Sequence, residues 1–162
     1  MKQTKASSKD ERIRKAKDQF ARGERKTSNN SGRGLNGIRN DLGHNCRSMW
    51  EANIARVLKF KKISYEFEPK VFPFYDEKGN LIDSYLPDFY LPQSKVWLEV
   101  KGQMDETSKN KLKLMEEHYP NERVFIIEGD TYDKMISFLS YNNIVWERSG
   151  RNIKTHPHLF EK

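Results

Sequence analysis

The stretch from Ser84 to Gly102 (SYLPDFYLPQSKVWLEVKG) constrains the fold more than any other part of the chain. Two short apolar runs flank LPQSK at residues 91–95, which has the proline and polar residues of a bend, so the stretch predicts an antiparallel β-hairpin. Side chains two residues apart share one face of a strand. On the second arm, one face therefore carries Val96, Leu98 and Val100, which we expect to point into a core. The other face carries Trp97, Glu99 and Lys101.

The first arm of this hairpin carries Asp88, which strand pairing can bring beside Glu99 or diagonal to it. Two carboxylates this close repel each other unless a cation lies between them or one of them stays protonated. Their oxygens suit Mg²⁺, which takes one or two protein carboxylates and keeps several waters. Lys101 can stabilise charge that develops on a phosphate or position a deprotonated water. The hairpin thus predicts metal-assisted hydrolysis of a phosphodiester.

A purely structural explanation competes with this one. Glu and Lys two residues apart on a strand are common and usually form a solvated cross-strand pair, and Glu99 and Lys101 alone favour that explanation. The Pro87-Asp88 dipeptide, however, places a second carboxylate eleven residues before Glu99, on the other arm of the hairpin. The two arms together favour a site.

Hydrophobic periodicity in the rest of the chain predicts an α/β protein, with a mixed sheet that has helices on its faces. Ser48 begins the first predicted helix, because Glu51 follows it at the spacing of a capping box. The predicted elements are a helix over 48–62, a half-buried strand over 63–68, an extended segment over 71–74, a turn at 76–80, the hairpin, a helix over 105–119, a buried strand over 123–128, a helix through 132–139 and a short strand over 144–146.

Positive charge is concentrated near the N-terminus. Residues 1–47 contain 13 Lys and Arg against 5 Asp and Glu, a net charge of +8, whereas residues 48–162 contain 17 against 18, a net charge of −1. We therefore predict a basic, partly disordered arm over 1–47, a folded domain over 48–146 and a C-terminal tail over 147–162. Such an arm suits a polyanionic partner, most often nucleic acid, although a disordered solubilising segment is the alternative.

Six basic residues are candidates for contacts with nucleic acid: Arg33, Arg39, Arg47, Lys59, Lys109 and Lys111. The three arginines belong to the predicted arm, which can follow a groove or a phosphate backbone. Lys59 lies at the end of the first predicted helix, where a cation also suits the helix dipole. Lys109 and Lys111 follow the hairpin closely, and a solvated helix face is their alternative explanation.

The chain has one cysteine, Cys46, which excludes an intramolecular disulfide framework and fits a reducing compartment. No apolar run approaches the length of about 18 residues that a membrane span needs, and no apolar stretch follows the basic N-terminus as in a secretory signal. We expect a cytoplasmic protein with no membrane partner.

The motif YLPDFYLP followed by VWLEVKG resembles the core of the PD-(D/E)XK nuclease superfamily. The likeness extends through RSMWEANIARVLKFKKISYEFEP and KNKLKLMEEHYPNERVFII, over roughly residues 47–146, and within the superfamily it is greatest to the phage junction-resolving enzymes called endonuclease I. Phage homing endonucleases built on the same core share the signature. Residues 1–45 lie outside the resemblance.

The resemblance implies roles for four residues. Asp88, Glu99 and Lys101 match the Asp and the Glu-x-Lys of the motif, and Glu51 matches the acidic position on the preceding helix. The implied metal ligands are Asp88, Glu99 and Glu51. For Glu51 there is a competing role as the capping glutamate of Ser48, and the two roles need the same carboxylate.

The resemblance also implies a restriction-endonuclease-like fold, a dependence on Mg²⁺ for which Mn²⁺ substitutes, and products with 5′-phosphate and 3′-hydroxyl ends. It implies no small-molecule cofactor, a homodimer, because two cuts need two sites, and the host cytoplasm if the chain is phage-encoded. The expected function is a metal-dependent DNA endonuclease selective for branched or junction DNA. A sequence-specific homing or nicking endonuclease and a DNA-binding protein without catalysis are the alternatives.

Overall fold

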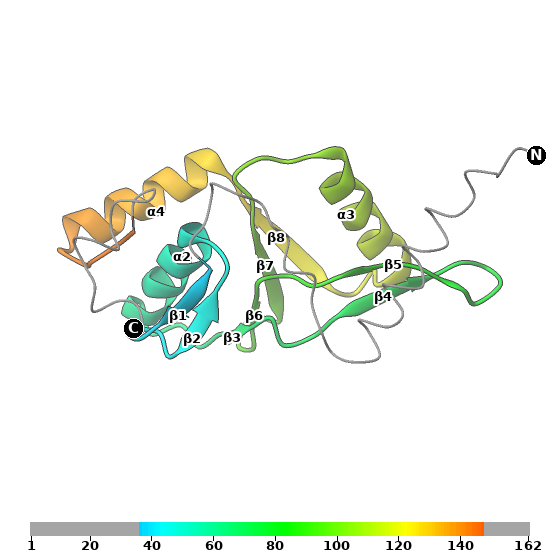
Figure 1. Cartoon of the computed structure of the whole chain (residues 1–162), viewed down its shortest axis with the longest axis horizontal. Helices are drawn as coiled ribbons and strands as arrows, with labels where there is room; N and C mark the ends of the chain where they lie inside the picture. Colours follow the sequence, from blue (N-terminus) through cyan, green and yellow to red (C-terminus); the bar gives the residue numbers. More distant parts are fainter. Residues whose placement is uncertain (1–35, 148–162) are drawn as a thin grey trace, which may run out of the picture.

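Residues 36–147 are the part of the chain that the computed structural model describes, and there they form a mixed α/β structure with three helices and three small sheets (Figure 1). The elements are β1 (Gly37–Arg39), β2 (His44–Cys46), α2 (Met49–Phe60), β3 (Glu66–Phe67), β4 (Phe72–Tyr75), β5 (Leu81–Tyr85), β6 (Phe89–Leu91), β7 (Val96–Val100), α3 (Glu106–His118), β8 (Arg123–Ile127) and α4 (Gly129–Tyr141).

The central sheet has the strand order β3-β6-β7-β8. β6 and β7 are the predicted hairpin and pair antiparallel, with Phe89 opposite Leu98 and Leu91 opposite Val96. β3 pairs antiparallel with β6, whereas β8 pairs parallel with β7. The chain passes through α3 between β7 and β8, which is the crossover that parallel pairing requires. The predicted mixed sheet is therefore present.

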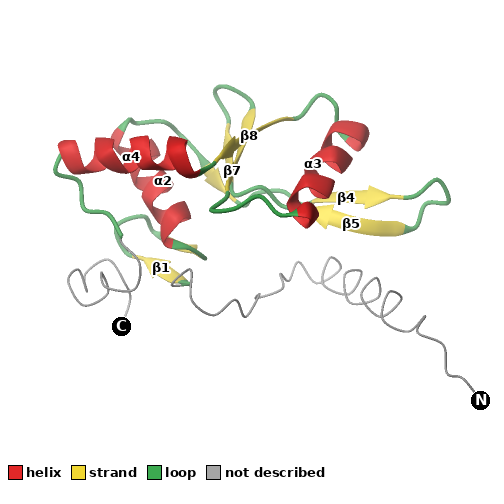
Figure 2. Cartoon of the chain, turned by 90° about the horizontal axis from the view of Figure 1, so that it is seen from above, coloured by secondary structure: helices red, strands yellow, loops and turns green. Residues whose placement is uncertain are grey.

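Both faces of this sheet are covered (Figure 2). On one face α2 and α4 enclose a core that includes Ile54, Phe89 and Ile127. On the other, α3 and the β4–β5 hairpin enclose a second core around Trp97 and Met115. Trp97 is 3% exposed, so the face of β7 that carries Glu99 is also buried.

The helices α2 and α3 begin where their capping residues predict. Ser48 Oγ accepts a hydrogen bond of 3.1 Å from the N–H of Glu51 at the start of α2, and the Asp105 carboxylate accepts one of 2.8 Å from the N–H of Ser108 at the start of α3. The predicted helices over 48–62 and 105–119 are confirmed, as is the third. None of the helices within residues 36–147 has both the length and the apolar character needed to cross a membrane.

Three predicted strands differ from the structure. Residues 144–146 form no strand, and the half-buried strand predicted over 63–68 shortens to β3. β8 is an edge strand rather than a buried one, and the Phe125 side chain on it is 55% exposed. The first two differences arise because a strand needs a partner, and these short segments find few or none within residues 36–147. β8 is exposed on one side because, among the described strands, it pairs with β7 alone.

The folded part also begins earlier and ends later than predicted. β1 and β2 form an antiparallel pair beside α2, and the Cys46 side chain is fully buried (Figure 1). Glu147, assigned to the tail, is 1% exposed. The predicted boundaries at 47 and 146 therefore cut through packed structure. Most of the predicted arm, up to residue 35, and the tail from residue 148 lie outside the described residues.

A buried ion cluster joins the two ends of the described part. The Glu147 carboxylate accepts hydrogen bonds from Arg39 at 2.9 and 3.0 Å and from Arg56 at 2.8 Å, and Arg56 also pairs with Asp41 at 2.7 Å. The side chain of Arg39 is fully buried. The guanidinium of Arg39, predicted to contact nucleic acid, instead neutralises a buried carboxylate in this structure.

Replacement of Glu147 by alanine should destabilise the fold strongly, because two buried guanidinium groups lose their shared carboxylate. We expect Glu147→Ala to lower the free energy of unfolding by about 3–5 kcal/mol. Urea denaturation followed by circular dichroism measures this change. The matched control is Glu116→Ala on the exposed face of α3, which should change stability by no more than about 0.5 kcal/mol. Equal effects of the two substitutions would contradict a stabilising role for the cluster.

Candidate active site

The register of β6 and β7 brings the two predicted carboxylates together. Because Phe89 lies opposite Leu98, the residue before it, Asp88, comes next to Glu99. Asp88 Oδ2 accepts a hydrogen bond of 2.7 Å from the N–H of Val100. Asp88 is 5% and Glu99 6% exposed. The predicted proximity of the two residues is confirmed, and both carboxylates are largely withdrawn from water.

The Glu99 carboxylate is held by two groups. Tyr85, on β5, donates a hydrogen bond of 3.0 Å from its hydroxyl to Oε2, and Lys101 Nζ lies 2.8 Å from Oε1. Tyr85 is buried in the second core and was missed by the sequence prediction. Its contact depends on how the β4–β5 hairpin packs on the central sheet, which no local pattern indicates. The result is a carboxylate with a fixed orientation.

Glu51 reaches the same place from the first turn of α2. Its Oε2 accepts a hydrogen bond of 2.8 Å from the N–H of Arg47, whereas the capping bond to Ser48 uses the Glu51 backbone N–H. The hydrogen bond from the Glu51 backbone N–H to Ser48 therefore uses no carboxylate oxygen of Glu51. The two roles predicted to compete for Glu51 are compatible in the structure.

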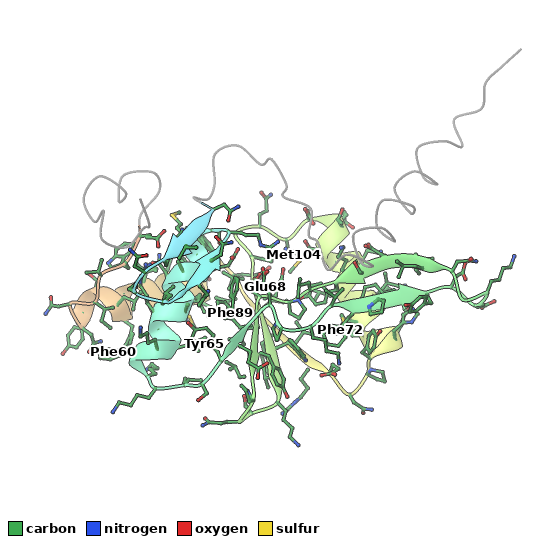
Figure 3. The ribbon with its side chains drawn as sticks, turned by 60° about the horizontal axis from the view of Figure 1, so that its bottom comes forward. Phe60, Tyr65, Glu68, Phe72, Phe89 and Met104 are labelled. Carbon is green, nitrogen blue, oxygen red and sulfur yellow. The ribbon has the colours of Figure 1, made fainter. Side chains whose placement is uncertain are left out.

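Glu68 is a fourth acidic residue of the site, and the sequence prediction missed it. It follows β3, and its N–H donates a hydrogen bond of 2.9 Å to the Asp88 carbonyl oxygen. Carboxylate oxygens of Glu51, Glu68 and Asp88 all lie within 4.8 Å of one another. Figure 3 places Glu68 near the middle of the molecule, between Phe89 and Phe72.

A backbone feature explains why Glu68 was overlooked. The alternation of β3 predicts that Glu66 and Glu68 share a solvent-facing side. The structure gives Glu68 a φ of 49°, a left-handed conformation that non-glycine residues seldom adopt. The alternation therefore ends before Glu68, and its carboxylate joins the cluster.

The electrostatics of the cluster favour bound protons or cations. Burial raises the pKa of Asp88 well above its usual value, and the charges of Glu99 and Glu51 raise it further, against the lowering effect of the Val100 N–H. Burial also raises the pKa of Glu51 and of Glu68, although Arg47 opposes both shifts. A group of carboxylates in this state gains when a cation is bound among them.

Lys101 remains charged beside these acids. Burial by itself lowers the pKa of Lys101, but the adjacent Glu99 carboxylate raises it, with Asp88 adding to the effect, and the net shift is upward. Its ammonium group is therefore a hydrogen-bond donor at neutral pH. It suits stabilisation of negative charge or orientation of a hydroxide, and it does not suit the role of a neutral base.

The donor set fits a hard divalent cation. Glu51, Glu68 and Asp88 offer carboxylate oxygens at short mutual distances, and Glu99 adjoins Asp88. Hard oxygen ligands are what Mg²⁺ and Mn²⁺ prefer. Of the predicted ligands Asp88, Glu99 and Glu51, the structure brings all three to one place and adds Glu68.

The predicted nucleic-acid contacts lie in different surroundings. Arg47 is at the site itself and pairs with Glu68. The three lysines lie elsewhere. Lys59 donates a hydrogen bond to the Asp41 carbonyl oxygen, and Lys109 pairs with Glu106. Lys111 pairs with Asp83 and donates to the Ser84 carbonyl oxygen. Arg33 lies outside the described residues. Of the candidates within residues 36–147, only Arg47 touches the carboxylate cluster.

Comparison of the chain with models of protein families, with curated proteins and with solved structures gave no match.

The raised carboxylate pKa values predict that the metal-free protein loses stability as pH rises. Below the usual carboxylate range the folded and unfolded states are both protonated, and between that range and the raised pKa values the folded state holds more protons. Stability therefore falls as pH increases through the raised pKa values. Asp88→Asn removes one of these groups, so it should reduce the fall and raise the melting temperature by a few degrees at pH 8 in the presence of a chelator.

Differential scanning calorimetry at pH 5.5 and pH 8, without metal, measures this difference. Asp133→Asn, an exposed carboxylate on α4, is the control and should follow the wild type at both pH values. If the melting temperature of Asp88→Asn depended on pH as steeply as that of the wild type, burial would not be raising the pKa of Asp88.

Proposed function

We propose that the chain is a metal-dependent DNA endonuclease that hydrolyses phosphodiester bonds and is selective for branched or junction DNA. The observation that carries this proposal is the meeting of the buried carboxylates of Glu51, Asp88 and Glu99, with the partly exposed Lys101 paired to Glu99. Carboxylates can hold a cation that activates water and polarises a phosphoryl oxygen, and a charged amine can stabilise the charge that develops there. All four are competent residues, which favours an enzyme over a DNA-binding protein that has lost its catalysis.

The arrangement of elements supports the same proposal. The helix that carries Glu51 precedes an antiparallel pair that carries Asp88 and Glu99, and α3 then leads to the parallel strand β8. This order resembles the restriction-endonuclease-like core of the PD-(D/E)XK nucleases. The likeness to the junction-resolving enzymes of that superfamily extends into the flanking helices, and it is the reason for preferring branched DNA.

Each residue has a distinct task in this proposal. Asp88, Glu99 and Glu51 would hold the cation, and Mg²⁺ or Mn²⁺ when bound supplies a Lewis acid and lowers the pKa of coordinated water. Tyr85 keeps Glu99 in one orientation through its hydroxyl. Lys101 donates from its ammonium group to the phosphate oxygen that gains charge or to the attacking hydroxide.

Affinity for DNA would come largely from charge outside this site. Residues 1–35 contain 11 Lys and Arg against 4 Asp and Glu, and residues 36–147 contain 15 against 18. Neutralisation of phosphates by such a segment is independent of sequence and weakens steeply with salt. A homing or nicking endonuclease would use the same segment for groove contacts. A homodimer would supply the second active site for the second strand.

The first test is cleavage of a four-way DNA junction and of a linear duplex with the same arm sequences, with and without Mg²⁺. We expect the wild type to cut the junction only with the metal, and Glu99→Gln to cut neither substrate. The control Glu66→Gln, an exposed carboxylate on β3, should cut like the wild type. Metal-dependent cutting of a longer natural DNA alone would favour homing or nicking, and binding without any cutting would contradict the enzymatic proposal.

Lys101 should matter for turnover more than for cation binding. Lys101→Met keeps the length of the side chain but removes the donor, and we expect kcat on the junction to fall by about 10²–10³. The affinity for Mn²⁺, measured by isothermal titration calorimetry, should stay within a few-fold of the wild type. Lys113→Met on the exposed face of α3 (72% exposed at Lys113) is the matched control. An unchanged kcat in Lys101→Met would exclude the proposed role.

A further inference from the structure

One residue of the site is an arginine that lies among its carboxylates. Arg47 donates from its backbone N–H to Glu51 Oε2, and its guanidinium pairs with Glu68. The charge of Arg47 also acts on the buried Asp88. One arginine thus interacts with each of the three carboxylates whose oxygens lie within 4.8 Å of one another.

Two polar atoms at this place lack a hydrogen-bond partner. Asp88 is 5% exposed. Among residues 36–147, the only group that donates a hydrogen bond to its carboxylate is the Val100 N–H, which contacts Oδ2. No donor in that part of the chain contacts Asp88 Oδ1. The Nε atom of Arg47 is also buried and contacts no acceptor. A buried donor without an acceptor is costly, and Asp88 Oδ1 is left open to accept from a ligand, so the cluster is incomplete as it stands.

The guanidinium neutralises this cluster incompletely. Arg47 brings one positive charge to three carboxylates, and the nearby Lys101 is paired with Glu99. A divalent cation would carry twice the charge and could use the unpartnered oxygen of Asp88, which the guanidinium does not contact.

The exposure of the Arg47–Glu68 pair allows an exchange. The Arg47 side chain is 32% and the Glu68 side chain 18% exposed, so the guanidinium can leave toward solvent without opening a core. Partly exposed ion pairs contribute little to stability. A divalent metal ion can therefore compete with the Arg47 guanidinium for the Glu68 carboxylate, and its higher charge favours its binding.

We propose that Glu51, Glu68 and Asp88 form a divalent-cation subsite beside the Asp88–Glu99 position, and that Arg47 is its resident counter-ion, displaced from Glu68 when the cation binds. The proposal deepens the proposed function, because it concerns the loading of the same site, but it can be tested without DNA. It makes Glu68 a cation ligand and Arg47 a residue that controls cation affinity.

The test is titration of metal-free protein with Mn²⁺ by isothermal titration calorimetry, at constant pH and ionic strength. Glu68→Gln should weaken the binding of one ion by about tenfold or more, which is the size of effect that loss of a supporting ligand produces. Arg47→Gln should strengthen it by several-fold, since the competitor is gone. Arg47→Lys keeps the charge and should stay near the wild type. Glu66→Gln on β3 is the control and should change nothing.

The double variant Arg47→Gln/Glu68→Gln separates exchange from a general charge effect. If Arg47 and the cation compete for the carboxylate of Glu68, the gain in Mn²⁺ affinity from Arg47→Gln should vanish when Glu68 is absent. Thermal melts of each variant show whether it is folded. A folded Arg47→Gln with wild-type Mn²⁺ affinity would overturn the proposal, as would a folded Glu68→Gln with unchanged affinity.

The outcomes also distinguish this proposal from the nuclease. If no DNA is cut but the Mn²⁺ affinities change as expected, the cation subsite stands and the proposed function is wrong. If cutting requires Mg²⁺ and Glu99 while Arg47→Gln leaves Mn²⁺ binding unchanged, the nuclease stands and the exchange with Arg47 is wrong.

Discussion

The pairing of β6 with β7 is the constraint on which the rest of the site depends. This register sets Asp88 beside Glu99 and against the Val100 N–H, inside the protein rather than at its surface. A buried carboxylate beside another is unfavourable unless protons or cations compensate it. The surrounding elements provide such compensation in part, through Lys101 at Glu99 and Arg47 at Glu68.

The two cores hold the pieces of the site in place. The core between the sheet and the α2–α4 pair positions the first turn of α2, from which Glu51 extends. The core on the opposite face positions β5, from which Tyr85 reaches Glu99. The ion cluster of Glu147 adds a further tie, because Arg56 belongs to α2 and Arg39 to β1. Packing far from the carboxylates thus determines their distances from one another.

The two cations of the site differ in their surroundings, and this suggests different tasks. Lys101 is one residue past the end of β7, where its backbone N–H also donates to the Ile127 carbonyl oxygen, so its position is set by the sheet. Arg47 precedes α2 and is held by a partly exposed pair. The first is suited to act on a bound phosphate from a fixed place. The second is suited to exchange with a solvated cation.

The sequence alone determined the features that depend on near neighbours in the chain. These are the helix starts at Ser48 and Asp105, the β6–β7 hairpin and the meeting of Asp88 with Glu99, since a short bend leaves few ways to pair its arms. Only the tertiary structure decided the contacts of Tyr85 and Glu68 with this hairpin and the burial of Arg39 against Glu147, 108 residues away. The physical reason is that periodicity reports which face of an element is apolar, whereas it carries no information on which distant side chain a buried polar group will meet.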